Sequence, residues 1–214
     1  MLSETEITTF DKHFNSVRGI LEALALREKL PMYGEGPKGM FRHYATSSPA
    51  LIELINYLRI RIDQLDQEER LSRKRSFLDL GCGLGVVTHM VKTWAGTPAY
   101  GVDICKEYID IASLGGKSTN FKHSNIFDLR APYLKNFTFL YMYEPMWRKK
   151  QAEKLIDFVV KKLQPHQEII FRSGGGYGVP HLDKYVQKGK LCSIPRKLIS
   201  QYQPPQFYIY KLKQ

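Results

Sequence analysis

The chain of 214 residues is long enough for one sizeable hydrophobic core, and a division into two independent domains would leave one of them small. Its 43% hydrophobic and 25% charged residues are typical of a globular protein and exclude a disordered chain, and its formal net charge is +11. No apolar run approaches the roughly 20 residues that span a bilayer, and the first residues do not resemble a secretion signal, so we predict a cytoplasmic protein.

Two helices are predicted before residue 76. The first begins with the capping-box pattern Ser3-Glu-Thr-Glu6 and carries an apolar stripe at three- and four-residue steps. The second begins at Ser48-Pro49, which supplies a cap and a favourable first helical residue. The segment 32–48 between them is rich in glycine and aromatic residues and predicts an ordered loop. We therefore divide the chain into an N-terminal helical cap, 1–75, and a core, 76–214.

A short apolar strand, 77–80, is followed by glycine at positions 81, 83 and 85 and then by a helix over 86–94. Glycine at this density suits a tight turn that a ligand approaches closely. A second strand, 99–103, ends in Asp103, which lies 24 positions after Asp79 and should arrive beside the turn after one crossover helix. The pattern indicates the nucleotide-binding half of a doubly wound α/β fold, in which a carboxylate at this position can accept both hydroxyls of a ribose.

The pattern Asp79-x-Gly81-x-Gly83-x-Gly85, with an acid closing the next strand, resembles the class I S-adenosylmethionine-dependent methyltransferase superfamily. The resemblance implies a Rossmann-like α/β fold with a seven-stranded, mostly parallel sheet, and S-adenosylmethionine as the cofactor. Asp79 would then face the ammonium of the cofactor, and N–H groups of the turn its carboxylate. The cofactor-binding residues expected on this basis are Asp79, Gly81, Cys82, Gly83, Gly85, Asp103, Ile104, Asn125 and Ile126.

The N-terminal cap and the third strand also acquire roles from the resemblance. Additions like residues 1–75 often carry acceptor specificity and close over the cofactor. The candidate pocket residues there are Tyr33, His43, Tyr44 and Thr46, each with a packing role as the alternative. After the third strand, 119–123, Asn125 stands where the superfamily commonly has an aspartate that accepts from the adenine amino group. Asparagine keeps an acceptor oxygen. Asp128 is the alternative if the register differs.

The fourth strand and its exit, 137–146, should face the transferred methyl group. Many amino-group methyltransferases carry Asn-Pro-Pro-Tyr there, whereas this chain has Tyr143-Glu-Pro-Met. Glu144 could act as a general base, and Tyr141 and Tyr143 could form an aromatic wall around a cationic group. The alternatives are that Tyr141 belongs to the core and that Glu144 stabilises the start of the next helix. The departure argues against amide methylation and leaves the acceptor atom open.

The remaining elements are an amphipathic helix over 147–163, a strand over 168–172, and two last strands within 190–200 and 206–213. The glycine-rich segment 173–180 predicts a flexible rim of the acceptor site with no helix after it.

Charge is concentrated in the last third of the chain. Residues 148–214 hold 14 Lys and Arg against 4 Asp and Glu, a difference of +10. Such a surface could meet nucleic acid, an acidic protein or an anionic membrane surface, or it could simply be solvated. The three cysteines and six histidines have neither disulfide nor metal-ligand spacing, so no metal is predicted. Cys82 in the turn is better explained as a small packed side chain than as a reactive thiol.

The sequence therefore leaves three hypotheses. The favoured one is a methyltransferase acting on a protein side chain or a small molecule. The second is an RNA methyltransferase that uses the basic last third. The third is a module that binds S-adenosylmethionine without activity, which the missing Asn-Pro-Pro-Tyr motivates.

Overall fold

The computed structural model describes residues 1–30, 46–68, 75–114, 120–143, 149–172, 178–194 and 207–213. Four of the candidate site residues, Tyr33, His43, Tyr44 and Glu144, lie outside these ranges. Across the described ranges, no helix combines the length and the apolar character needed to span a bilayer.

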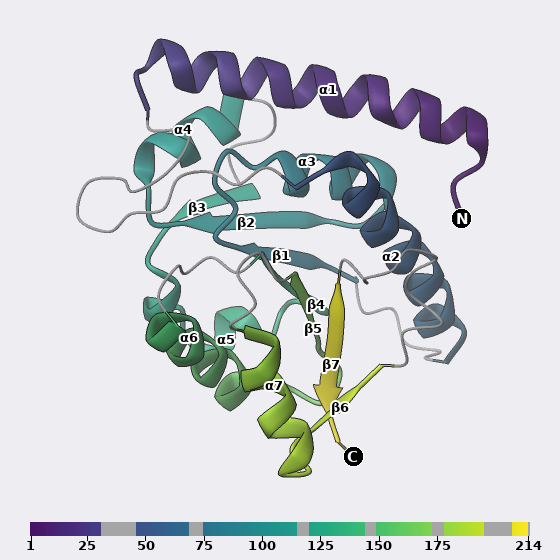
Figure 1. The fold of residues 1–214 in the computed structure, drawn as a ribbon, viewed down its shortest axis with the longest axis vertical. Coiled ribbons are helices and arrows are strands. Elements are labelled where there is room, and N and C mark those ends of the chain that lie inside the picture. Colours follow the sequence, from purple (N-terminus) through teal and green to yellow (C-terminus); the bar gives the residue numbers. More distant parts are fainter. Residues whose placement is uncertain are drawn as a thin grey trace.

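Seven strands form one sheet in the order β3-β2-β1-β4-β5-β7-β6 (Figure 1). Their bounds are β1 Phe77–Leu80, β2 Ala99–Asp103, β3 Phe121–His123, β4 Phe139–Tyr143, β5 Glu168–Arg172, β6 Leu191–Ser193 and β7 Tyr208–Leu212. Strands β1 to β5 are parallel, and β7 runs antiparallel to both β5 and β6. The predicted α/β class and the seven-stranded, mostly parallel sheet are confirmed. The chain order reverses between β1 and β4, where open α/β sheets bind their ligands.

Helices cover both faces of this sheet. One face carries α2 (Ser48–Glu68), α3 (Val86–Trp94) and α4 (Lys106–Leu114), and the other carries α5 (Ala131–Leu134), α6 (Lys149–Lys162) and α7 (Gly178–Gln187) (Figure 1). Side chains alternate along a strand, so Phe77 and Tyr141 join the core under the first set, while Leu78 and Leu140 join the second. Because both faces are covered, β1 and β5 are buried at every position.

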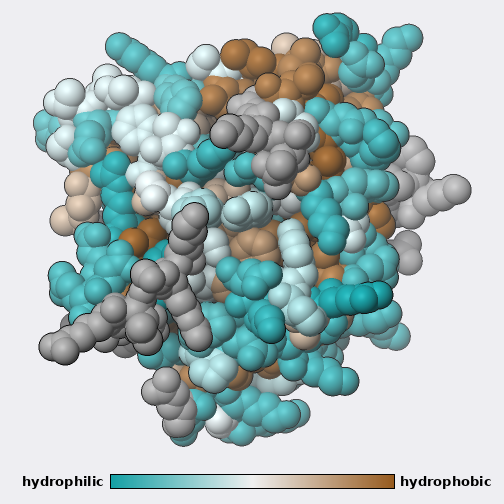
Figure 2. Space-filling view, turned by 180° about the vertical axis from the view of Figure 1, so that it is seen from behind, coloured by the Kyte–Doolittle hydropathy of each residue, from teal (hydrophilic) through white to brown (hydrophobic). Residues whose placement is uncertain are grey.

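The first helix, α1 (Glu4–Arg27), forms an extra layer outside α3 and α4 (Figure 1). Of the apolar stripe that the periodicity predicted, Phe10, Phe14 and Leu21 are buried and Val17 and Leu24 are partly buried, and Ala25 is buried beside them. Its outer side leaves two large apolar residues in solvent, Ile20 and Leu26. Figure 2 shows an exposed apolar patch at the top of the molecule, where α1 lies in Figure 1, above a mostly hydrophilic rear face.

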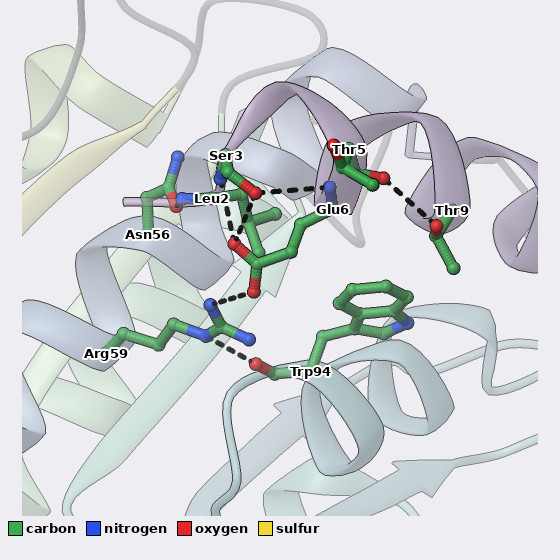
Figure 3. Close-up of polar contacts among 8 residues, drawn as sticks. All are labelled: Leu2, Ser3, Thr5, Glu6, Thr9, Asn56, Arg59 and Trp94. Atoms are coloured by element: carbon green, nitrogen blue, oxygen red, sulfur yellow. Dashed lines mark hydrogen bonds and ion pairs between the residues drawn. The ribbon is translucent and has the colours of Figure 1, made fainter.

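Polar contacts hold the start of α1 to the rest of the fold (Figure 3). The predicted capping box is present, because the Ser3 backbone N–H donates to Glu6 Oε2 over 2.8 Å and the Glu6 N–H donates to Ser3 Oγ over 3.3 Å. Arg59 of α2 then joins three elements, since its Nη1 lies 3.2 Å from Glu6 Oε1 and its Nε donates to the Trp94 carbonyl over 2.7 Å. The described part of residues 1–75 thus shares one core with the α/β sheet. Its role as a lid stays a prediction.

One predicted element is wrong. The helix α7, Gly178–Gln187, stands where the glycine-rich sequence predicted none. Leu182 is buried against the sheet, and Pro180 falls in the first turn, where a missing N–H costs no helical hydrogen bond. Gly178 is required by close packing, because a Cβ there would lie 2.1 Å from the Phe171 ring.

Candidate functional site

The glycine turn between β1 and α3 is tied to the end of β2. The N–H groups of Gly81 and Cys82 both donate to the Val102 carbonyl, over 2.8 and 3.0 Å, and the Gly85 N–H donates to the Cys82 carbonyl over 2.8 Å. Gly81, Gly83 and Gly85 have φ angles of 89°, 52° and 77°, which place all three in the left-handed region. Side chains rarely tolerate this conformation. The three alternating glycines are therefore needed for the path of the backbone itself.

Packing imposes a second requirement on this turn. A Cβ at Gly85 would lie 2.6 Å from the Phe121 ring, and one at Gly101 would lie 2.7 Å from Cys82 Sγ. Cys82 is buried and packs directly against Gly101, which has no room for a side chain. Burial and the nearby charge of Asp79 raise the pKa of its thiol well above the ordinary value. Because a protonated thiol is a poor nucleophile, the structure favours the packed side chain over the reactive thiol.

Asp79 lies beneath the turn as a buried and weakly bonded acid. Its carboxyl is 3% exposed, and its Oδ2 accepts one hydrogen bond, from Thr88 Oγ1 over 3.3 Å. Burial, together with the charge of Asp103, raises the pKa of Asp79 to about 8. A cation placed against this carboxyl would favour its ionised form. The Asp79 carboxyl therefore fits the cofactor ammonium that the resemblance assigned to it.

Asp103 has a bracing role that the sequence did not reveal. Its Oδ2 accepts from the Gly83 N–H and its Oδ1 from the Cys105 N–H, both over 2.9 Å. Burial raises the pKa of this carboxyl, while these two hydrogen bonds oppose the shift. Each carboxylate oxygen has a second lone pair, so Asp103 can hold the turn and still accept from a ribose hydroxyl. Ile104 beside it is 49% exposed, as a residue that covers a ligand ring would be before binding.

The residues predicted after β3 are placed less favourably for the cofactor. Asn125 caps the short helix η3 (Ile126–Asp128), with its Oδ1 accepting from the Phe127 N–H over 3.0 Å. Ile126 is buried in the core on the α5 and α6 face. The alternative Asp128 is exposed. Contacts of Asn125 and Ile126 with the adenine of the cofactor stay predictions.

The exit of β4 separates the two predicted tyrosines. Tyr141 is 1% exposed, packs against Phe77 and Phe207, and its hydroxyl lies 3.4 Å from Thr46 Oγ1. Burial raises its pKa. The core alternative for Tyr141 is therefore the one the structure favours, and Thr46 contributes by contacting it. Tyr143 is only partly buried and points to the same face two residues nearer the sheet edge.

A residue that sequence reasoning missed, Arg172, lies beside Tyr143. The two residues are opposite one another in the β4–β5 register, and the Arg172 guanidinium carbon lies 4.3 Å from the centre of the Tyr143 ring. The available signal was a charged residue that ends a strand whose three central residues are apolar. No group of three or more metal-ligating side chains is found in the part of the chain that the structure describes.

Solved methyltransferase structures share this architecture at low sequence identity. A proposed RNA methyltransferase from Pyrococcus horikoshii is 15% identical with a TM-score of 0.53, over 91% of this chain and 98% of that one. Magnesium protoporphyrin IX methyltransferase from Synechocystis PCC 6803, solved with bound S-adenosylmethionine, is 12% identical with a TM-score of 0.52, over 93% and 96%. A cofactor-bound protein from MTB is 12% identical with a TM-score of 0.55, over 93% and 90%.

No protein-family model and no curated sequence matches the chain. The structural likeness, together with the strand order and the glycine turn, defines the class at the level of the fold. The chain has the class I S-adenosylmethionine-dependent methyltransferase fold.

Proposed function

We propose that the protein is an S-adenosylmethionine-dependent methyltransferase. The observation that carries the proposal is the glycine turn at the point where the strand order reverses, with Asp79 and Asp103 on either side of it. A buried acid with a single weak hydrogen bond and a second acid with spare acceptor capacity match the ammonium and the ribose of the cofactor. The fold shared with S-adenosylmethionine-bound methyltransferases supports the same conclusion.

The residues of this chain would hold the two reactants rather than activate the donor. S-adenosylmethionine supplies a methyl group already activated as a sulfonium. Asp79 would bind its ammonium, Asp103 its ribose, and Ile104 would cover part of the adenine. The side chain of Tyr143 would border the acceptor at the exit of β4. Catalysis would then depend on alignment of donor and acceptor and on exclusion of water. Glu144 remains the candidate general base.

Binding of S-adenosylhomocysteine, the demethylated product, tests the proposal directly. We expect calorimetric titration to give saturable binding by the full chain, and Asp103→Ala to abolish it, because the ribose acceptor and the brace for the turn are lost together. Asp110→Ala is a matched control, since Asp110 is an exposed acid of α4 whose described partner is Lys106. Unchanged affinity in Asp103→Ala would contradict the proposal.

The acceptor is proposed to be a small molecule or a protein side chain, with RNA as the second candidate. Transfer of a labelled methyl group into a cell lysate, followed by nuclease or protease digestion, distinguishes them. Label in neither polymer nor small molecules would favour a binding module without activity.

One observation favours the RNA candidate. Four lysines of α6, at positions 149, 150, 154 and 161, are exposed in the basic last third of the chain. RNA binding through them would weaken linearly on a plot of log affinity against log salt. Association that does not depend on salt would count against this candidate.

A further inference from the structure

Strand β5 ends in a buried cation for which the described residues provide no ion partner. Arg172 is 8% exposed, and its Nη1 has no hydrogen-bond partner. No described carboxylate forms an ion pair with it. A buried charge of this kind is unfavourable unless something pairs with it. Since a planar guanidinium matches carboxylate and phosphate groups in a bidentate manner, the side chain is equipped for an anion that the described part of the chain does not supply.

Tyr143 lies against this guanidinium. The guanidinium carbon lies 4.3 Å from the ring centre, and the two residues face each other across neighbouring strands. This cation–π contact restricts the guanidinium without using an N–H donor, and Nη1 has no hydrogen-bond partner. The pair is thus preorganised, and an anion that enters it would meet donors already in place.

The position of the pair separates it from the amino-acid end of the cofactor site. Asp79 is opposite Tyr141 in the register of β1 and β4, and Tyr143 is opposite Arg172 in the register of β4 and β5. All four side chains lie on one face, because they alternate in step along their strands. Arg172 is two strands from Asp79, about 10 Å across the sheet at the usual strand spacing, and is also two residues further toward the carboxyl edge. It therefore lies on the side of the β4 exit, where the acceptor is expected.

We propose that Arg172 binds an anionic group, a carboxylate or a phosphate, of the methyl acceptor, and that Tyr143 positions it for this role. A side chain buried this deeply suits a small anion or an inserted side chain rather than the backbone of a nucleic-acid duplex. The identification of that anion as part of an acceptor rests on the proposed methyltransferase function. The presence of an anion site at Arg172 does not.

Small aromatic probes test the site without knowledge of the acceptor. Ligand-observed NMR would measure binding of benzoate, phenyl phosphate and the uncharged match benzamide to the full chain, with and without S-adenosylhomocysteine. We expect at least one anion to bind in preference to benzamide, and Arg172→Gln to weaken that anion about tenfold or more. Arg172→Lys should retain part of the binding, because it keeps the charge and loses the planar fork.

Controls separate the site from general charge and from misfolding. Arg130→Gln removes one exposed positive charge and should leave anion binding unchanged. Thermal unfolding would confirm that each variant is folded, and Arg172→Lys supplies a second test should Arg172→Gln fail to fold. Equal anion binding by Arg172→Gln and the original chain, or equal binding of benzoate, phenyl phosphate and benzamide, overturns the proposal.

A second arm distinguishes the acceptor from the carboxylate of the cofactor. Arg172→Gln should bind both S-adenosylhomocysteine and 5′-methylthioadenosine, which lacks the amino-acid end, as the original chain does. A loss confined to S-adenosylhomocysteine would assign Arg172 to the cofactor and overturn the acceptor assignment. If the original chain binds no S-adenosylhomocysteine, the proposed function fails, while the anion titrations without it still decide the Arg172 site.

Discussion

Glu168 and Arg172 stand at opposite ends of β5 and on the same face of the sheet, and both are buried, but their surroundings differ. Glu168 Oε1 lies 2.6 Å from Arg61 Nε and its Oε2 accepts from the Tyr57 hydroxyl over 2.5 Å, so this charge is paired by two residues of α2. Arg172 has a tyrosine ring beside it, and no carboxylate of the described residues forms an ion pair with it. The buried charge at the amino edge of the sheet is thus paired within the fold, whereas at the carboxyl edge Arg172 has no described ion partner, which is the basis of the anion site proposed above.

The largest effect is expected at Asp79, on the carboxyl edge. Its pKa is raised from 3.8 to about 8, so between these pH values the folded state keeps a proton that the unfolded state has released. Stability must therefore fall as pH rises through this window, by up to about 1.4 kcal/mol per pH unit. Asp79→Asn removes this dependence. In urea unfolding from pH 4 to pH 8, the free energy of unfolding of Asp79→Asn should rise relative to that of the original chain. The variant should also lose affinity for S-adenosylhomocysteine.

A flat difference between the two chains over this pH range would contradict the assignment of a buried, unpaired acid. Thr88→Val is a useful companion, because it removes the single described hydrogen bond to Asp79 and should move the pH dependence further in the same direction.

The next effect is expected on the amino edge. Glu168→Gln removes the charge and with it the ion pair to Arg61, whose side chain is 16% exposed. Loss of one member of a buried pair typically destabilises a protein by about 3 kcal/mol or more. The free energy of urea unfolding at pH 7 should fall accordingly. A change below about 1 kcal/mol would show that this pair contributes little to stability.

A smaller loss should follow Tyr57→Phe, which deletes only the hydroxyl that donates to Glu168. One hydrogen bond to a charged group contributes about 1.5–3 kcal/mol. In a double-mutant cycle, Tyr57→Phe and Glu168→Gln should be less than additive, because both remove the same contact. Strict additivity would contradict the pairing seen here.

The smallest effect on stability is expected for Arg172→Gln. Because no ion pair is broken, the free energy of unfolding should change by less than about 1 kcal/mol or increase. The variant for comparison is Glu168→Gln on the same strand, in which an amide replaces a charge that has an ion partner. If Arg172→Gln lowers the free energy of unfolding as much as Glu168→Gln does, Arg172 also contributes to stability, and the contrast between the two edges of the sheet is wrong.

The parts of the fold that the sequence predicted well are those with local signals. Strands β1 and β2 and the helix α3 match their predicted bounds, because glycine and proline mark their ends and the apolar runs between them are short. The helix α7 was missed because only a sparse apolar stripe follows the glycine-rich segment. The reason for glycine at position 178 is its contact with Phe171 of β5, and that contact is visible only in the folded chain.

The candidate site was predictable only where chemistry follows from chain position. Asp79 and Asp103 could be placed beside the turn because one crossover brings parallel strands together. The bond from the Gly83 N–H to Asp103 could not be foreseen, because it depends on the closed shape of the turn. Arg172 could not be identified as a candidate because its contact with Tyr143 depends on β4 and β5 being neighbours, which the sequence does not show.

The anchoring of α1 in Figure 3 has a consequence for its dynamics. Helix ends usually unravel first and exchange their amide hydrogens quickly. Here the Leu2 N–H donates to Asn56 Oδ1 over 2.8 Å, and Glu6 is held by Arg59, which also holds the end of α3. In deuterated water, the amides of this first turn should therefore exchange slowly, and their protection would report whether α1, α2 and α3 remain docked.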